Sequence, residues 1–222
     1  MSRIVVKVGG AVAGSVASHV NDLATSCCEV VVVHGAGPQI SAEMERRGLP
    51  VEFVGGRRVT TPAALAVVRE SFAVVNAALC AAIGERAVPM FGDEIGLAAR
   101  QVPELGLVGD PVPCRPPAIE VALALGLIPV VAPLASGPLN VNADEAASAL
   151  AIGLGAEKIL FLTDVPGLLL EGSVVPSIEA GTAQGLLDAG ELEGGIVPKL
   201  QAAVTAAKLG VRAEIGETAV LA

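Results

Sequence analysis

Two lysines stand close to paired glycines, one near each end of the chain. Lys7 lies two residues before the glycine pair of the segment KVGG, and Lys199 lies four residues after the pair in GGIVPK. A lysine inside a run of Ile and Val has buried neighbours, which costs free energy unless its ammonium group meets a partner or a ligand. We therefore interpret Lys7 as functional, whereas Lys199 alone would also fit a solvated lysine in the first turn of a helix.

A second glycine-rich segment, HGAGPQI, follows four consecutive valines. Gly35 and Gly37 let the backbone approach a ligand closely, and the helix expected to follow would point amide groups at an anion. The dinucleotide fingerprint needs a third glycine where Ile40 stands, and a Walker A loop needs Gly-Lys-Ser/Thr, which is absent. The segment fits an anion-binding turn, and a plain strand-to-helix turn is the alternative.

Polar side chains alternate with apolar ones in a third segment, PLNVNADEAASALA. Asn140, Asn142 and Asp144 would point in one direction if this stretch is extended, just before an alanine-rich helix. Asn and Asp also favour the capping position of a helix, which is the alternative for any one of them. Three such residues together are better explained as a polar site.

Two arginines follow another glycine pair in the segment GGRRVT. A guanidinium group can hold a carboxylate through two parallel hydrogen bonds, so Arg57 and Arg58 are candidates for gripping an acidic ligand. His34 is the histidine near these motifs, and we interpret it as a residue that orders its loop, not as a catalytic base. The motifs thus supply cations and amides for an anion without an obvious general base.

Alternating strands and helices are expected to position these motifs. Residues spaced three or four apart predict a helix over 61–86, with Pro62 in its first turn. Clusters of Gly, Pro and Ser predict loops or small hairpins over 103–117 and 165–176. β-Branched runs predict strands over 3–8, 29–34, 89–91, 128–131 and 158–162, with helices before the last two and over 196–209. The pattern predicts an α/β fold with a buried parallel sheet, as one large domain or two tightly joined lobes.

The composition restricts the partners and the compartment. With 14 basic and 23 acidic residues the net charge is −9, which argues against nucleic acid or an anionic membrane as the main partner. The longest apolar stretch, 121–135, is shorter than the ~20 residues of a spanning helix and contains two prolines. The four cysteines form no CxxC pair and are expected to be reduced thiols. We expect a cytoplasmic protein without a leader or a membrane span.

Six segments, in this order, resemble the landmarks of the amino acid kinase family over nearly the whole chain: KVGG, VVHGAG, GRRVT, NVNADEAASALA, LTDVPGLL and GGIVPK. The resemblance implies a three-layer α-β-α sandwich over 1–222, in which 1–155 binds an acylamino acid and 156–222 binds ATP. The motifs are most similar to those of members that phosphorylate N-acetyl-L-glutamate in arginine biosynthesis. The implied reaction moves the γ-phosphoryl group of ATP to the side-chain carboxylate.

The resemblance also implies roles for single residues. Lys7 and Lys199 would stabilise charge on the phosphoryl group, and Asp144 would hold both lysines in place. The substrate would be bound by Gly35, Ala36, Gly37, Arg58, Asn140 and Asn142. ATP would be bound by Gly9, Gly10, Thr163, Asp164, Val165 and Gly167. No protein metal site is implied, because Mg²⁺ would be held mainly by the nucleotide phosphates and water.

Two other functions stay open. One is a kinase for an α-aminoadipate derivative of lysine biosynthesis, whose extra methylene a pocket distinguishes by only ~1–3 kcal/mol. The other is a non-catalytic ligand-sensing subunit of the same fold, although both lysines and Asp144 are present. We expect a homodimer joined through the helix over 61–86. We also expect insensitivity to arginine, because arginine-inhibited relatives carry an extra helix before the first strand.

Overall fold

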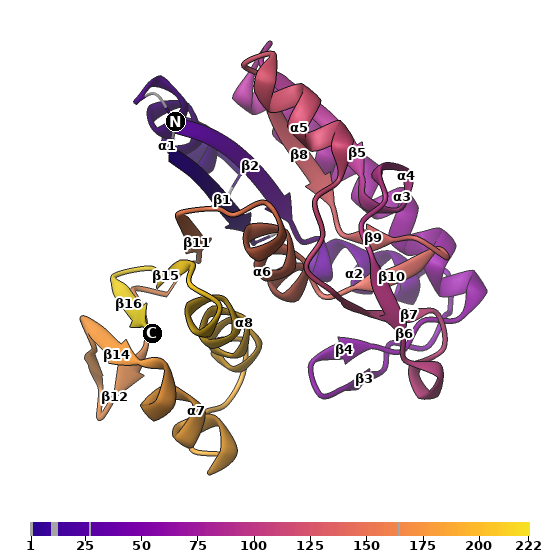
Figure 1. Cartoon of the computed structure of the whole chain (residues 1–222). Coiled ribbons are helices and arrows are strands. Elements are labelled where there is room, and N and C mark those ends of the chain that lie inside the picture. Colours follow the sequence, from indigo (N-terminus) through magenta and orange to yellow (C-terminus); the bar gives the residue numbers. More distant parts are fainter. Residues whose placement is uncertain (1, 10–12, 27, 164) are drawn as a thin grey trace.

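The computed structural model describes residues 2–9, 13–26, 28–163 and 165–222. Gly10 and Asp164, both predicted to contact ATP, lie outside the described residues, as does Cys27. The described part forms three layers, with a central sheet between two layers of helices (Figure 1). The predicted α-β-α sandwich is confirmed.

The central sheet has eight strands among the described residues. From β15 to β5 the strands run parallel, whereas β16 and β14 at one edge run the other way. The order across the sheet is β14 (Ser177–Glu179), β16 (Thr218–Leu221), β15 (Arg212–Ile215), β11 (Lys158–Leu162), β1 (Ser2–Val8), β2 (Cys28–His34), β8 (Ile128–Ala132) and β5 (Ala87–Phe91). The chain moves from β1 toward β5 and later returns to β11 on the other side of β1. The carboxyl ends of β1 and β11 therefore form a switch point, where open α/β sheets bind ligands.

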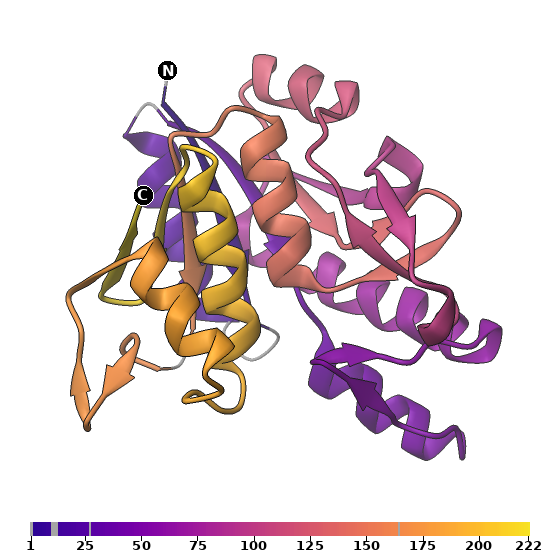
Figure 2. The ribbon, with the colours of Figure 1, turned by 60° about the horizontal axis from the view of Figure 1, so that its bottom comes forward.

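Helices cover both faces of the sheet. On one face lie α1 (Ala13–Thr25) and α3 (Pro62–Ile83). The other face carries α5 (Pro117–Ala124), α6 (Ala143–Gly153) and α8 (Ile196–Lys208). Figure 2 shows α6 and α8 side by side over the sheet, with α7 (Ala180–Asp188) next to α8. Two further helices are α2 (Gly37–Arg46), which packs on α3, and the short α4 (Gly92–Ile95).

Local sequence explains where the main helices begin. The Thr61 hydroxyl accepts a hydrogen bond from the Ala64 N–H, and Pro62 occupies the first turn of α3. Asn142 caps α6 in the same way, because its side-chain oxygen accepts from the N–H groups of Asp144 and Glu145. Within the described chain, α3 alone is long and apolar enough to cross a membrane, by length and composition only. Its inner face packs on the sheet as a core helix would.

Short strands outside the central sheet complete the fold. A four-stranded sheet contains β6 (Ala99–Gln101), β7 (Val108–Pro111), β10 (Leu139–Val141) and β9 (Leu134–Ala135), with the 3₁₀ turn Pro103–Leu105 between β6 and β7. Two hairpins are formed by β3 (Phe53–Val54) with β4 (Arg57–Arg58) and by β12 (Leu169–Leu170) with β13 (Ser173–Val174). Loops or small hairpins were predicted over 165–176 and 103–117. The first segment contains the β12–β13 hairpin, and the second contains the 3₁₀ turn and β7, which pairs antiparallel with β6. Cys28, Cys80 and Cys114 are free thiols.

Candidate active site

Lys7 and Asp144 form a buried ion pair between the central sheet and the start of α6. Val6 and Val8 pack in the cluster beneath α1 and α3, so Lys7, between them on β1, faces the opposite layer. Lys7 Nζ lies 2.9 Å from Asp144 Oδ1, and the two side chains are only 6% and 7% exposed. Asp144 stands in the first turn of α6, where the helix dipole favours a carboxylate. The carboxylate compensates an ammonium group that would otherwise be costly to bury.

Lys199 approaches the same carboxylate from the first turn of α8. Its Nζ lies 4.0 Å from Asp144 Oδ2 and 3.1 Å from the carbonyl oxygen of Gly195, to which it donates. Each oxygen of Asp144 therefore faces one lysine. Two ammonium groups thus meet at one carboxylate, and cations gathered beside a cavity suit an anionic ligand.

Arg58 adds a third buried cation to this region. Its side chain reaches α2, where Nη2 donates to Ser41 Oγ at 2.8 Å and to the Gly37 carbonyl oxygen at 3.1 Å. The guanidinium group also lies over the Phe53 ring, at 4.6 Å from its centroid. Burial lowers the pKa of Arg58, whose residue is 6% exposed. Since neutral groups satisfy these hydrogen bonds, the charge itself is available to a carboxylate ligand.

Asn140 and Asn142 have different surroundings. Asn140 Nδ2 donates to the hydroxyl of Thr60 at 3.0 Å, and both residues are buried. Asn142 is the cap of α6, so the extended segment ends there and Asp144 is already helical. The predicted alternation therefore does not continue to Asp144. All three predicted residues still border one cavity, because the turn into α6 brings Asp144 back toward β10.

The glycine-rich segment after β2 begins α2 at the same cavity. Gly35 N–H donates to the Val8 carbonyl oxygen at 3.0 Å, which joins β2 to the end of β1 and removes this amide from the set predicted to bind substrate. The N–H groups of Ala36 and Gly37 stand at the helix start, which leaves such groups without intrahelical partners. A Cβ atom on Gly37 would touch no described atom. Packing within the protein therefore does not explain a glycine at this position. A ligand that approaches the backbone closely would explain it.

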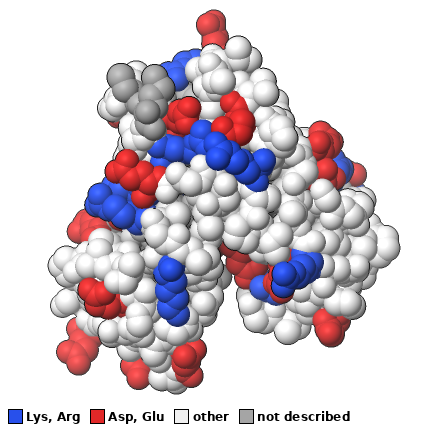
Figure 3. Space-filling model, viewed as in Figure 1, with Lys and Arg blue, Asp and Glu red and all other residues white. Residues whose placement is uncertain are grey.

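These residues border a cavity of about 290 Å³. The residues singled out from the sequence that line it are Lys7, Gly9, Gly35, Ala36, Gly37, Arg57, Arg58, Asn140, Asn142, Asp144 and Lys199. A second cavity of about 700 Å³ contains Thr163, Val165 and Gly167, together with Lys199. Gly9, predicted to contact ATP, lines the first cavity and not the second. Figure 3 shows the surface deeply indented between the C-terminal part and the part that carries the β3–β4 hairpin.

Gly167 has a structural reason to be glycine. A Cβ atom there would lie 2.5 Å from the Thr218 hydroxyl, which accepts a hydrogen bond from the Leu168 N–H. This close packing holds the segment after β11 against β16. The position of the loop thus depends on β16 as well as on its own sequence.

His34 is a fully buried neutral residue below the glycine-rich segment. Its ring meets Phe72 edge-on with centroids 5.7 Å apart, and neither nitrogen makes a hydrogen bond of normal geometry with the described residues. Burial lowers the pKa of His34 to about 4. A group with this pKa and these surroundings does not suit a general base at neutral pH, in agreement with the sequence interpretation.

Arg57 differs from the sequence interpretation. The sequence made it a candidate for binding a ligand carboxylate, but in the structure it already contacts two protein carboxylates, Glu145 and Asp110. The sequence reasoning did not single out these two acids. Glu145 could have been found from its position, because it directly follows Asp144 in the sequence.

The comparisons with known proteins agree with this geometry. A model of the amino acid kinase family matches residues 2–216, so the chain belongs to the amino acid kinase family. It is 41% identical to an acetylglutamate kinase from Rubrobacter xylanophilus, over 97% of this chain and 88% of the relative. It is 40% identical to an acetylglutamate kinase from Frankia casuarinae, over 95% of this chain and 65% of the relative.

A solved structure also matches almost completely. The protein smu.665 from Streptococcus mutans superimposes with a TM-score of 0.90 at 28% identity, and the match covers 99% of this chain and 98% of that one. The resemblance stated from six short motifs is therefore confirmed over the whole fold.

Proposed function

We infer that this protein transfers the γ-phosphoryl group of ATP to the side-chain carboxylate of N-acetyl-L-glutamate and so acts in arginine biosynthesis. The relatives named acetylglutamate kinase support this acceptor. The observation that carries the inference is the charge arrangement of the cavity. One carboxylate lies between two lysines, and a buried arginine without an acidic partner among the described residues borders the same space.

The proposed chemistry is stabilisation of charge. A phosphoryl group in transfer spreads negative charge over its oxygens, so fixed cations and amides supply most of the catalysis. Lys7 and Lys199 serve as those cations, and Asp144 holds both ammonium groups in register. The N–H groups of Ala36 and Gly37 add donors at the start of α2.

The acceptor is activated by its own ionisation. A glutamate side chain has an unperturbed pKa near ~4.3, so it is already a nucleophile at neutral pH. No general base is required, which is consistent with the neutral, buried His34. Arg58 holds the acceptor's other carboxylate, with Asn140 and Asn142 beside it.

ATP occupies the second cavity in this proposal. Lys199 borders both cavities, so the phosphates extend past it toward Lys7. Mg²⁺ enters as part of the MgATP substrate and neutralises phosphate charge. Among the described residues, no group of three His, Cys, Asp or Glu side chains could hold a metal ion, and Asp144 is committed to the lysines. We accordingly assign acceptor binding to 1–155 and nucleotide binding to 156–222.

The outer face of α3 supports the proposal of a homodimer. It is exposed and built of small apolar residues, with Val74 70% exposed. The other members are Ala63, Ala66, Ala73, Ala77, Ala78, Ala81 and Ala82. A second copy can cover such a face with its own α3. Sedimentation should show a dimer that Val74→Glu dissociates, and a wild-type monomer would overturn this assignment. Cytoplasmic location and insensitivity to arginine stay predictions.

The experiment that tests the function is an ATP-dependent hydroxamate assay that traps the acyl phosphate. N-acetylglutamate, glutamate and N-acetyl-α-aminoadipate serve as parallel acceptors, beside Lys7→Ala and Lys199→Ala. Product with N-acetylglutamate, lost in both variants, is expected. Preference for the longer acceptor would move the chain to lysine biosynthesis, and no product despite ligand binding would indicate the sensing subunit.

A further inference from the structure

Arg57 joins three elements beside the proposed acceptor site. Its Nε and Nη2 lie 3.1 and 3.0 Å from Glu145 Oε1, and Nη2 also contacts Asp110 Oδ1. Arg57 belongs to β4, Glu145 to the first turn of α6 and Asp110 to β7. The side chains of Arg57 and Glu145 are about one quarter exposed, so solvent screens this ion pair only in part.

The β3–β4 hairpin is held on one side by the backbone hydrogen bonds of Thr60 to Leu105 and Leu107, and otherwise by side-chain contacts. Its strands have two residues each, pair only with one another in the described part of the chain, and turn at Gly55 and Gly56. Isolated two-stranded hairpins are marginally stable in water. Arg57 and Arg58 are neighbours on one strand, so their side chains leave opposite faces: Arg58 reaches α2, and Arg57 reaches α6 and β7.

Glu145 links this contact to the proposed catalytic residues. It follows Asp144 in the first turn of α6, and the Asn142 side chain caps the N–H groups of both. Glu145 Oε2 is buried and has no hydrogen-bond partner among the described residues, and burial raises the pKa of this carboxyl group. Without Arg57, this carboxylate would lack its cation and the hairpin would lose its contact with α6.

We propose that Arg57 is a positioning residue that fixes the β3–β4 hairpin, and with it Arg58, at the acceptor side of the cavity. It acts through Glu145 and Asp110 and does not bind the substrate carboxylate itself. The identity of the acceptor rests on the proposed function, whereas the role of Arg57 in holding the hairpin does not. Loss of Arg57 should therefore weaken acceptor binding and leave nucleotide binding unchanged.

The test compares Arg57→Met with Glu145→Gln, Arg57→Lys and the double variant. Calorimetry with N-acetylglutamate alone should show the Kd of Arg57→Met raised about 10-fold, a loss typical of one charged hydrogen-bond partner. The KM for this acceptor should rise in parallel, while kcat and the KM for ATP stay within about twofold. Arg57→Lys should retain part of the affinity, and the double variant should be less impaired than the sum of the single variants.

Arg69→Met provides the matched control. Arg69 also contacts two carboxylates, Asp93 and Glu94, but does not border the cavity. Hydrogen exchange of a peptide over 52–60, measured without ligand, should accelerate in Arg57→Met and not in Arg69→Met. This comparison remains decisive if the wild type proves to phosphorylate another acceptor. Equal exchange in the two variants, or equal losses in acceptor and ATP binding, would overturn the proposal.

Discussion

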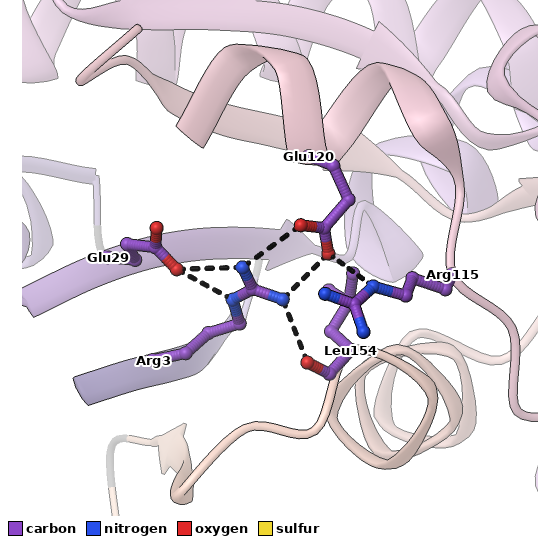
Figure 4. Close-up of polar contacts among 5 residues, drawn as sticks. All are labelled: Arg3, Glu29, Arg115, Glu120 and Leu154. Atoms are coloured by element: carbon purple, nitrogen blue, oxygen red, sulfur yellow. Dashed lines mark hydrogen bonds and ion pairs between the residues drawn. The ribbon is translucent and has the colours of Figure 1, made fainter. Parts of the chain in front are cut away.

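Each end of β1 carries a cation, the half-buried Arg3 and the buried Lys7, but the two cations have different partners. At the amino end, Arg3 donates to Glu29 and Glu120 and to the carbonyl oxygen of Leu154, at 2.7 to 3.2 Å (Figure 4). Arg115 joins this network through Glu120 and, together with Arg3, holds the pKa of that carboxyl group below its usual range. At the carboxyl end, Lys7 and Lys199 both contact Asp144.

The difference separates a structural cluster from a binding site on one strand. In the cluster at Arg3, two arginines are paired with two glutamates, and the guanidinium groups donate to acceptors within the protein. At the other end, Lys7 and Lys199 both contact Asp144, and Arg58 borders the same cavity. Cations gathered around a partly closed cavity suit an anionic ligand. Loss of the cation should therefore reduce stability at one end and activity at the other.

The largest effect is expected for Lys7→Ala. The variant should lower kcat at least about 1,000-fold, because it removes a charge that acts on the transferred phosphoryl group. The hydroxamate assay measures it. Lys158→Ala is the control, because Lys158 lies on the neighbouring strand β11 and pairs with Glu214 at a distance of 2.8 Å. If both variants keep wild-type kcat, the carboxyl end of β1 is not the reaction centre.

Arg3→Met should show the reverse behaviour. Removing this guanidinium group leaves Glu29 and Glu120 short of a partner, which should lower the free energy of unfolding by about 3 kcal/mol. The kcat of the folded fraction should not change. Urea unfolding measures the first quantity, and Arg212→Met, an exposed arginine 3.8 Å from Glu214, is the control. A stable variant with low kcat would contradict the division between the two ends.

Arg58→Met should act on the acceptor alone. The KM for N-acetylglutamate should rise about 100-fold, as expected for the loss of a charge-assisted bidentate contact, with a small change in the KM for ATP. Initial rates over both substrates check this. Arg46→Met removes an exposed arginine from the same helix that Arg58 contacts and should leave both constants unchanged. A rise in the KM for ATP instead would place Arg58 on the nucleotide side.

The smallest effect concerns pH and His34. The pKa of His34 is about 4 in the folded chain and 6.5 for an unperturbed histidine, so between these pH values the unfolded chain binds a proton that the folded chain does not. The stabilising contribution is therefore complete above pH 6.5 and is lost as the pH falls toward 4, by about 2 kcal/mol between pH 7 and pH 5. Urea unfolding at both pH values should show a smaller loss for His34→Gln. Equal losses in variant and wild type would contradict the buried, neutral state.

Long elements could be predicted from the sequence because their residues repeat one signal. The strands β1 and β2 and the helix α3 were predicted to within a few residues of their observed ends. The four-stranded sheet was not predicted, because its strands have only two to four residues and its halves are joined by the pairing of β7 with β10, about 30 residues apart in the sequence. Such strands form through tertiary contacts and leave no period in the sequence.

The candidate site also has some features with a local sequence signal and others that depend on tertiary contacts. Lys7 was recognisable because a cation in an apolar strand needs a partner, and Asp144 because it belongs to a group of polar residues. Their 2.9 Å contact depends on α6 lying over β1, which no local pattern encodes. The N–H of Gly35 donates to Val8, and Arg57 pairs with two carboxylates. These partners become neighbours only in the folded chain, so the sequence alone did not reveal them.

Pro89 in the edge strand β5 has a consequence for how molecules associate. The strand spans Ala87–Phe91 and ends the central sheet, where an open edge can accept a strand from another molecule. Proline has no N–H, so an approaching strand finds a donor missing in the middle of this edge. The fold therefore carries its own protection against open-ended sheet growth, at the point where the parallel strands would otherwise continue.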